Sequence, residues 1–108
     1  MSQSEYQIVF TTCPDPAVAE QIAQTLVAEG LAACVNILPA MHSIYTWKGK
    51  MESTTEHLLL IKSRTHRYPA IQDRLRALHP YELPEIIAVP ITHGLPDYLA
   101  WLNHPDKN

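Results

Sequence analysis

A proline-rich segment from His79 to Pro90 constrains this chain more than any other part of its sequence. Pro80, Pro84 and Pro90 each fix their own φ angle and lack a backbone N–H donor, so the segment cannot form a helix. It must end the helix that precedes it, form a rigid polar corner and enter a short apolar strand. One imidazole, one phenol and two carboxylates lie on this stiff backbone, an arrangement that suits a binding site and also suits a plain corner.

The size and charge of the chain define its broad class. Its 108 residues, 46% of them hydrophobic, predict a single domain over residues 1–108, with a core that needs no disulfide bond or structural metal ion. A net charge of −3 gives no field that would attract nucleic acid or an anionic membrane. No signal peptide and no bilayer-spanning apolar run is visible, and Cys13 and Cys34 form no pairing motif. We therefore expect a cytoplasmic protein with two reduced thiols.

The pattern of apolar residues predicts the order of the elements. Strands are expected over residues 6–12, 31–45, 51–62 and 85–89, with a turn at Lys48–Gly49 or a near neighbour. Helices are expected after Asp15 with a C-terminal cap at Gly30, at Pro69, and after a cap at Asp97. This order predicts an α+β, ferredoxin-like βαββαβ fold with an antiparallel sheet, both main helices on one face and a short C-terminal helix. The fourth strand then lies antiparallel beside the first, which brings the corner at residues 79–85 close to residues 11–13.

The second and third strands are too long for the rest of the predicted sheet. They run about 12 to 14 residues each, or roughly 40 Å, whereas the first strand offers about seven residues for pairing. The outer half of this extended hairpin would carry unpaired edges and the apolar side chains of Ile44, Tyr45 and Trp47. Such an arm is expected to pack on a neighbouring subunit.

Several segments together resemble the CutA family, the divalent-cation tolerance proteins. They are residues 31–36 (LAACVN), 43–50 (SIYTWKGK), 59–63 (LLIKS), 79–86 (HPYELPEI) and 97–102 (DYLAWL). The resemblance covers roughly Ile8 to Leu102. It implies a PII-like homotrimer with the hairpin arms wrapped on neighbours, and a role in metal tolerance with copper as the usual ion.

The resemblance also implies where a metal would bind. The family's copper ligands are a cysteine of the first strand, which falls on Thr11 here, and a histidine pair, which falls on Leu78 and His79. Only His79 matches, and Cys13, two residues beyond Thr11 on the same side of the strand, is a candidate substitute. Copper favours thiolate and imidazole donors, so His79 and Cys13 are the candidate metal ligands.

Two functions fit this sequence. The first is a non-enzymatic, divalent metal-binding protein of metal homeostasis, with copper as the first candidate ion. The alternative is a PII-like signalling module whose intersubunit clefts bind a small metabolite or a partner protein. No nucleophile motif or glycine-rich phosphate loop accompanies the acidic residues of the corner, so we do not expect an enzyme. The candidate cleft residues are Lys62, Tyr81, Glu82 and Glu85, and the candidate subunit contacts are Tyr45, Trp47 and Trp101.

Basic residues gather near the second helix. Five of the eight lie within fifteen positions, namely Lys62, Arg64, Arg67, Arg74 and Arg76. A solvated helix face explains most of this cluster. A small-anion site at the N-terminus of that helix is the alternative interpretation.

Overall fold

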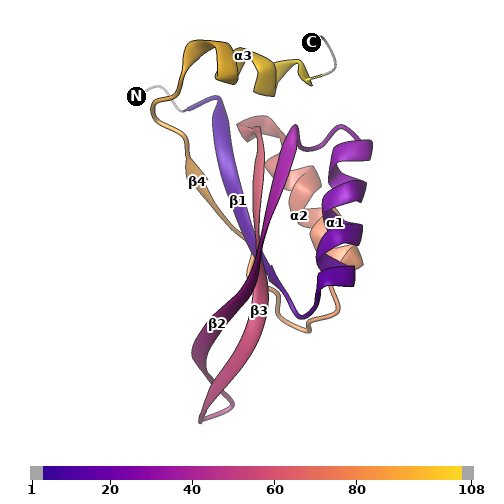
Figure 1. Cartoon of the computed structure of the whole chain (residues 1–108), viewed down its shortest axis with the longest axis vertical. Helices are drawn as coiled ribbons and strands as arrows, with labels where there is room; N and C mark the ends of the chain where they lie inside the picture. The colour runs from indigo at the N-terminus through magenta and orange to yellow at the C-terminus, as the bar shows by residue number, and fades with distance from the viewer. Residues whose placement is uncertain (1–3, 106–108) are drawn as a thin grey trace.

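A computed structural model describes residues 4–105 of the chain (Figure 1). The elements in order are β1 (Tyr6–Cys13), α1 (Pro16–Ala28), β2 (Cys34–Trp47), β3 (Lys50–Arg64), a 3-10 turn (Thr65–Arg67), α2 (Tyr68–Leu78), β4 (Ile87–Pro90) and α3 (Pro96–Asn103). The four strands form one sheet in the order β2-β3-β1-β4, and every neighbouring pair is antiparallel. This confirms the predicted ferredoxin-like fold with a short C-terminal helix.

Both ends of α1 follow the sequence signals. The Asp15 side chain accepts a hydrogen bond from the Val18 N–H at 2.9 Å, and Pro16 occupies the first turn, where its missing N–H costs nothing. At the other end Gly30 has φ +72°, and its N–H donates to the Val27 carbonyl while that of Leu31 donates to the Leu26 carbonyl. This pair of bonds is a Schellman cap, which satisfies the last carbonyls of the helix.

Several boundaries differ from the prediction, and β2 begins at Cys34, three residues later than expected. The fourth strand begins at Ile87 and ends at Pro90, because its ladder with β1 stops at the Phe10–Ile87 pair. Beyond that pair, the Thr12 carbonyl is hydrogen-bonded to the His79 ring. The C-terminal helix begins at Pro96 with Leu95 in the capping position, so Asp97 lies in the first turn and does not cap the helix.

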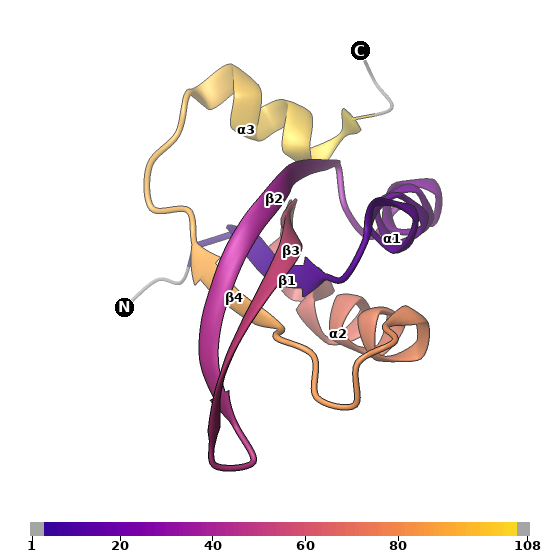
Figure 2. The same ribbon diagram turned by 60° about the horizontal axis from the view of Figure 1, so that its bottom comes forward.

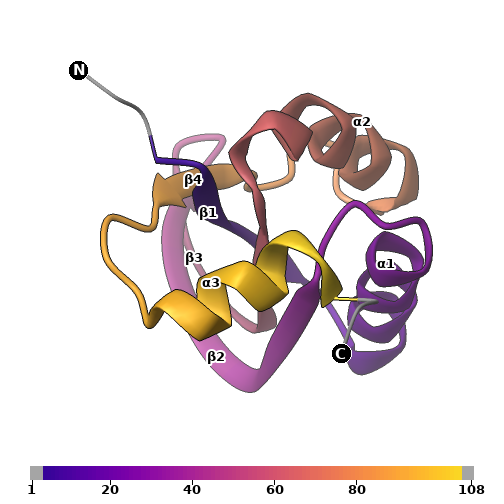
Figure 3. The same cartoon turned by 90° about the horizontal axis from the view of Figure 1, so that it is seen from above.

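The core lies between the sheet and the two main helices. Figure 3 shows α1 and α2 together on one face of the sheet, with α3 across one end. The fully buried apolar side chains come from β1, β3 and these two helices, and they include Val9, Leu59, Ile61, Ile22, Leu26, Ile71 and Leu75. The opposite face of the sheet carries apolar side chains as well, and Ile87 and Val89 there are 54% and 42% exposed.

The hairpin of β2 and β3 extends beyond the sheet, as predicted. The β1–β3 ladder ends at the Cys13–His57 pair, whereas β2 and β3 continue to pair with each other from Met41–Glu56 to Trp47–Lys50. The ladder shifts register at Pro39–Ala40, where the arm leaves the sheet, and Pro39 interrupts the ladder without ending the strand. Figure 2 shows this arm projecting from the body of the molecule.

The hairpin closes in a tight turn at Lys48 and Gly49, whose φ angles are +51° and +80°. Two consecutive positive φ values are what a type I′ hairpin turn needs, and its twist matches that of the flanking strands. No helix among residues 4–105 has the length and apolar character needed to cross a membrane.

Candidate functional site

The His79 side chain fixes the corner to the end of β1. Its Nε2 lies 2.7 Å from the Thr12 carbonyl oxygen, and its Nδ1 accepts the Tyr81 backbone N–H at 3.2 Å. A carbonyl can only accept, so Nε2 carries the proton and Nδ1 uses its lone pair for Tyr81. The ring is therefore neutral, and both of its nitrogens are engaged in a site where His79 is only 8% exposed. This confirms that the corner meets the end of β1.

Tyr81 joins the same corner to the base of the hairpin. Its hydroxyl donates to Glu56 Oε2 at 2.8 Å, and Glu56 on β3 is 6% exposed. The ring of Tyr81 also lies against that of His79, with centroids 4.8 Å apart. Burial raises the pKa of the Tyr81 phenol well above its usual range, and the hydrogen bond and charge of Glu56 add to this shift.

These contacts leave a pocket of about 630 Å³ between the corner, the end of β1 and the arm. The lining side chains are Thr12, Ser43, Ile44, Tyr45, Trp47, Glu56, Tyr81, Glu82, Leu83 and Glu85. The structure thus brings Tyr81, Glu82 and Glu85 together with the two aromatic residues of the arm. The lining includes three carboxylates and no lysine or arginine among the described residues, so the pocket is acidic.

Lys62, one of the predicted cleft residues, does not line this pocket. It lies on β3 beneath α3, with its Nζ 3.5 Å from the Tyr98 hydroxyl and 5.7 Å from the centre of the Tyr98 ring. Trp101 is on α3 as well, where its ring lies 5.6 Å from that of Tyr98. These side chains are therefore separated from the acidic pocket by the length of the β1–β3 ladder.

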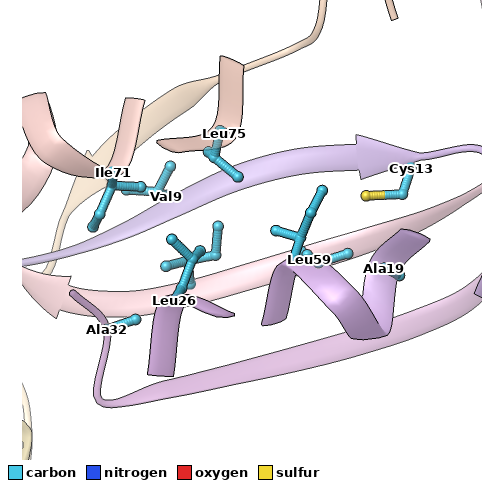
Figure 4. Packing of buried hydrophobic residues seen from close by; sticks show 10 residues of the cluster. Val9, Cys13, Ala19, Leu26, Ala32, Leu59, Ile71 and Leu75 are labelled. Carbon is cyan, nitrogen blue, oxygen red and sulfur yellow. The ribbon is translucent and has the colours of Figure 1, made fainter. Parts of the chain in front are cut away.

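Cys13 belongs to the core and does not reach the pocket. Its side chain is fully buried, and Figure 4 shows it among the packed apolar residues near Leu59 and Ala19. Thr11 and Cys13 do share one side of β1, as predicted, but that side faces the helices. Burial raises the pKa of the Cys13 thiol to about 11, with smaller contributions from Glu56 and Asp15, so the thiol is protonated at neutral pH.

The residues at the family's ligand positions offer few free donor atoms in this arrangement. Thr11 offers a buried hydroxyl that has no hydrogen-bond partner within residues 4–105, Leu78 offers no donor, and the His79 nitrogens are both engaged. No three His, Cys, Asp or Glu side chains within residues 4–105 are grouped so that they could hold one ion. The assignment of a metal to His79 and Cys13 stays a prediction, and it requires the loss of a His79 hydrogen bond and the exposure of a core thiol.

Sequence reasoning missed Glu56 as a member of the site. The signal was a single acid, separated by His57 from the apolar run of the third strand. Its burial depends on Tyr81, which is 25 residues away, and on the register shift opposite Pro39 and Ala40. Neither contact can be derived from the local pattern.

The fold and the pocket define a ferredoxin-like α+β domain with an extended hairpin and an acidic pocket at the base of that hairpin. The family model described as "CutA1 divalent ion tolerance protein" matches residues 7–105. The chain therefore belongs to the CutA1 family, and the resemblance found in its sequence is confirmed.

Relatives agree with this assignment along most of the chain. The divalent-cation tolerance protein CutA of Thermus thermophilus is 50% identical over 96 residues, which are 89% of this chain and 93% of that protein. A CutA homolog of Xenopus laevis is also 50% identical, over 86% of this chain, but the match spans only 62% of that longer protein. The solved structure of CutA from Xylella fastidiosa matches with a TM-score of 0.90 and 52% identity, over 93% of this chain and 96% of that one.

Proposed function

We propose that this protein contributes to divalent-cation tolerance as a non-enzymatic, cytoplasmic homotrimer that binds divalent metal ions, with copper bound most tightly. Membership of the CutA1 family supports the role in cation tolerance. The free thiols of Cys13 and Cys34 support a reducing compartment. The observation that carries the binding proposal is the acidic pocket at the hairpin base.

Glu82 and Glu85 are the carboxylates that we propose for the ion. Both are exposed at the pocket, so they can turn toward a cation at little cost, whereas the Glu56 carboxylate already accepts from Tyr81. Two carboxylates leave other coordination positions to water or to groups of a neighbouring copy in the trimer. At sites of oxygen and nitrogen ligands Cu²⁺ binds more tightly than Zn²⁺, which is why copper is the first candidate.

Calorimetric titration of the purified protein with Cu²⁺ and Zn²⁺ tests this proposal. The double variant Glu82→Gln/Glu85→Gln should lower the affinity for Cu²⁺ at least tenfold, since each substitution removes a negative ligand while preserving side-chain shape. Cys13→Ser should bind like the unchanged protein, because the thiol is buried and protonated. Glu20→Gln is the matched control, because Glu20 is an exposed carboxylate of α1 outside the pocket.

His79→Ala distinguishes the carboxylate site from an imidazole site. If His79→Ala abolishes Cu²⁺ binding while the double variant binds normally, the carboxylate proposal is wrong and the ligand implied by the family resemblance is correct. Circular dichroism of His79→Ala must match that of the unchanged protein, since the substitution also removes two hydrogen bonds of the corner. If no variant alters binding, the ion does not use this pocket.

A PII-like signalling module is the second candidate, and the size and aromatic lining of the same pocket favour it. Its volume of about 630 Å³ falls within the range of small-molecule sites, roughly 300–1,000 Å³. Its lining combines the aromatic side chains of Tyr45, Trp47 and Tyr81 with carboxylates, which disfavours phosphate-bearing metabolites and favours neutral or cationic ones. An amine metabolite that binds this pocket should quench tryptophan fluorescence saturably. If the quenching is lost in Trp47→Phe and is unaffected by a metal chelator, the result favours this function.

A further inference from the structure

A second cavity, of about 730 Å³, lies at the end of the sheet opposite the arm. Three parts of the chain form it: residues 27–28 and 30–33 at the end of α1, residues 63–64 and 66–67 between β3 and α2, and residues 102–105 at the end of α3. Figure 3 shows the end of α3 beside the segment that follows α1. The cavity shares no lining residue with the acidic pocket.

The charge of this cavity is opposite to that of the acidic pocket. Arg64 and Arg67 line it, and guanidinium groups stay protonated at every physiological pH. The imidazoles of His66 and His104 lie in the same lining, and no Asp or Glu among residues 4–105 does. Within residues 4–105, the lining therefore presents two guanidinium charges and no carboxylate to a group that enters this cavity.

Arg64 has more donors than its partners use. One terminal nitrogen donates to Asn103 Oδ1, while Nε is buried and has no partner among the described residues. Within residues 4–105 the nearest carboxylate oxygen, Glu5 Oε1, is 3.9 Å from the other terminal nitrogen, which is too long for a hydrogen bond. Because the buried Nε is out of reach, the terminal nitrogen near Glu5 is the Arg64 donor that can bind an oxyanion entering the cavity.

The C-terminus of α1 opposes an anion only weakly. A helix C-terminus carries the equivalent of roughly −0.5 charge, and the Schellman bonds from Gly30 and Leu31 already satisfy two of its carbonyls. Two guanidinium charges outweigh that partial charge. The lining also includes the apolar side chains of Val27, Leu31 and Leu102, which suit a hydrocarbon group rather than a fully solvated ion.

We propose that this cavity, which we call the basic cavity, binds a small organic anion. Its oxyanion group, a phosphate or a carboxylate, pairs with Arg64 and Arg67, and its apolar portion packs on Val27, Leu31 and Leu102. This ligand class cannot bind the acidic pocket, where three carboxylates would repel it. The site is therefore independent of the proposed metal site.

The proposal is tested by titrating the purified protein with n-hexyl phosphate and with hexanoate. Calorimetry measures the affinity, and amide NMR shifts locate the site. At least one of these probes should bind saturably, with one probe molecule per chain. The largest amide shifts should occur at residues 31–33 and 102–104. Which probe binds more tightly identifies the oxyanion group. Arg67→Gln should weaken binding about tenfold, the usual loss for one hydrogen bond to a charged group.

The matched control is Arg76→Gln, since Arg76 is an exposed arginine of α2 that does not line the cavity. It should leave the affinity unchanged, and an equal loss in both variants would show a general charge effect and overturn the site. Inorganic phosphate should bind at least tenfold more weakly than n-hexyl phosphate. If it binds equally well, the apolar wall takes no part and the proposed ligand class is wrong. If neither organic anion saturates at millimolar concentration, the basic cavity is not a binding site.

Discussion

At the residue scale, His79 joins three parts of the fold through one side chain and one backbone group. Its backbone N–H closes the last turn of α2 by donating to the Leu75 carbonyl at 2.8 Å. Its ring bonds the end of β1 through the Thr12 carbonyl and the corner through the Tyr81 N–H. A buried imidazole with both nitrogens satisfied is stable without a metal. These contacts account for a histidine at this position on structural grounds.

Cys13 and Cys34 should react very differently in the folded protein. The pKa of the Cys13 thiol is raised to about 11 by burial, so almost no thiolate exists at pH 8, and the side chain is also inaccessible. Cys34 is half-buried at the start of β2 and serves as the internal control. Iodoacetamide at pH 8 should label Cys34 in the native protein and label Cys13 only after unfolding, as mass spectrometry would detect. Equal native labelling of both would contradict the burial of Cys13.

The raised pKa of the Cys13 thiol also makes the stability of the protein depend on pH. Because the folded-state pKa of Cys13 lies above its value of about 9 in the unfolded chain, the neutral thiol contributes its full stabilisation below pH 9. That contribution is lost as the pH rises toward 11, and a shift of this size is worth about 2 to 3 kcal/mol. The urea midpoint should therefore fall between pH 9 and 11, and it should fall less steeply in Cys13→Ser.

At the scale of the elements, the bond between Tyr81 and Glu56 connects the corner to the hairpin. Glu56 is the first residue of β3 beyond the β1 ladder, so its side chain sits where the arm leaves the sheet. A buried carboxylate needs a donor, and among the described residues Tyr81 supplies the hydrogen bond that satisfies it. The bond therefore fixes how the arm is oriented relative to the body of the molecule.

Tyr81→Phe should destabilise the protein by about 1 to 3 kcal/mol, because it leaves the Glu56 carboxylate buried without its donor. Urea denaturation at a fixed protein concentration measures the change. Tyr45→Phe is the control, since Tyr45 lines the same pocket but is 41% exposed and makes no hydrogen bond through its hydroxyl within residues 4–105. Equal effects of the two substitutions would mean that the Tyr81–Glu56 bond contributes nothing of its own.

The sequence predicts the elements well where the signal is local. Asp15 and Gly30 mark the ends of α1, and Lys48–Gly49 marks the hairpin turn, because each depends on a few neighbouring residues. The approach of the corner to β1 also follows, since the order of the strands fixes it. The burial of Glu56 and the engagement of both His79 nitrogens depend on contacts across 25 and 67 residues, so no local pattern contains them.

At the scale of the whole molecule, two features have no partner within residues 4–105 of a single chain. In this part of the chain the strands of the arm, from Met41 to Glu56, pair only with each other, and the exposed side chains of the arm include Ile44 at 70% and Met51 at 79%. The sheet face away from α1 and α2 carries an apolar row, with Phe10 and Leu60 beside the exposed Ile87. Exposed apolar surfaces of this kind mark contacts with another protein. Both features would be covered if three copies packed sheet to sheet with each arm on a neighbour.

We therefore predict that the protein is a trimer, and sedimentation equilibrium should give about three times the chain mass of 12.2 kDa at micromolar concentration. Trp47→Ala should weaken assembly by a few kcal/mol, since a tryptophan that is 38% exposed on the isolated arm is a typical interface anchor. Val27→Ala is the matched control, because Val27 is 45% exposed on α1, away from the arm and the open sheet face. A folded monomer at micromolar concentration would contradict the trimer, because it would show that the arm and the open face are stable in water.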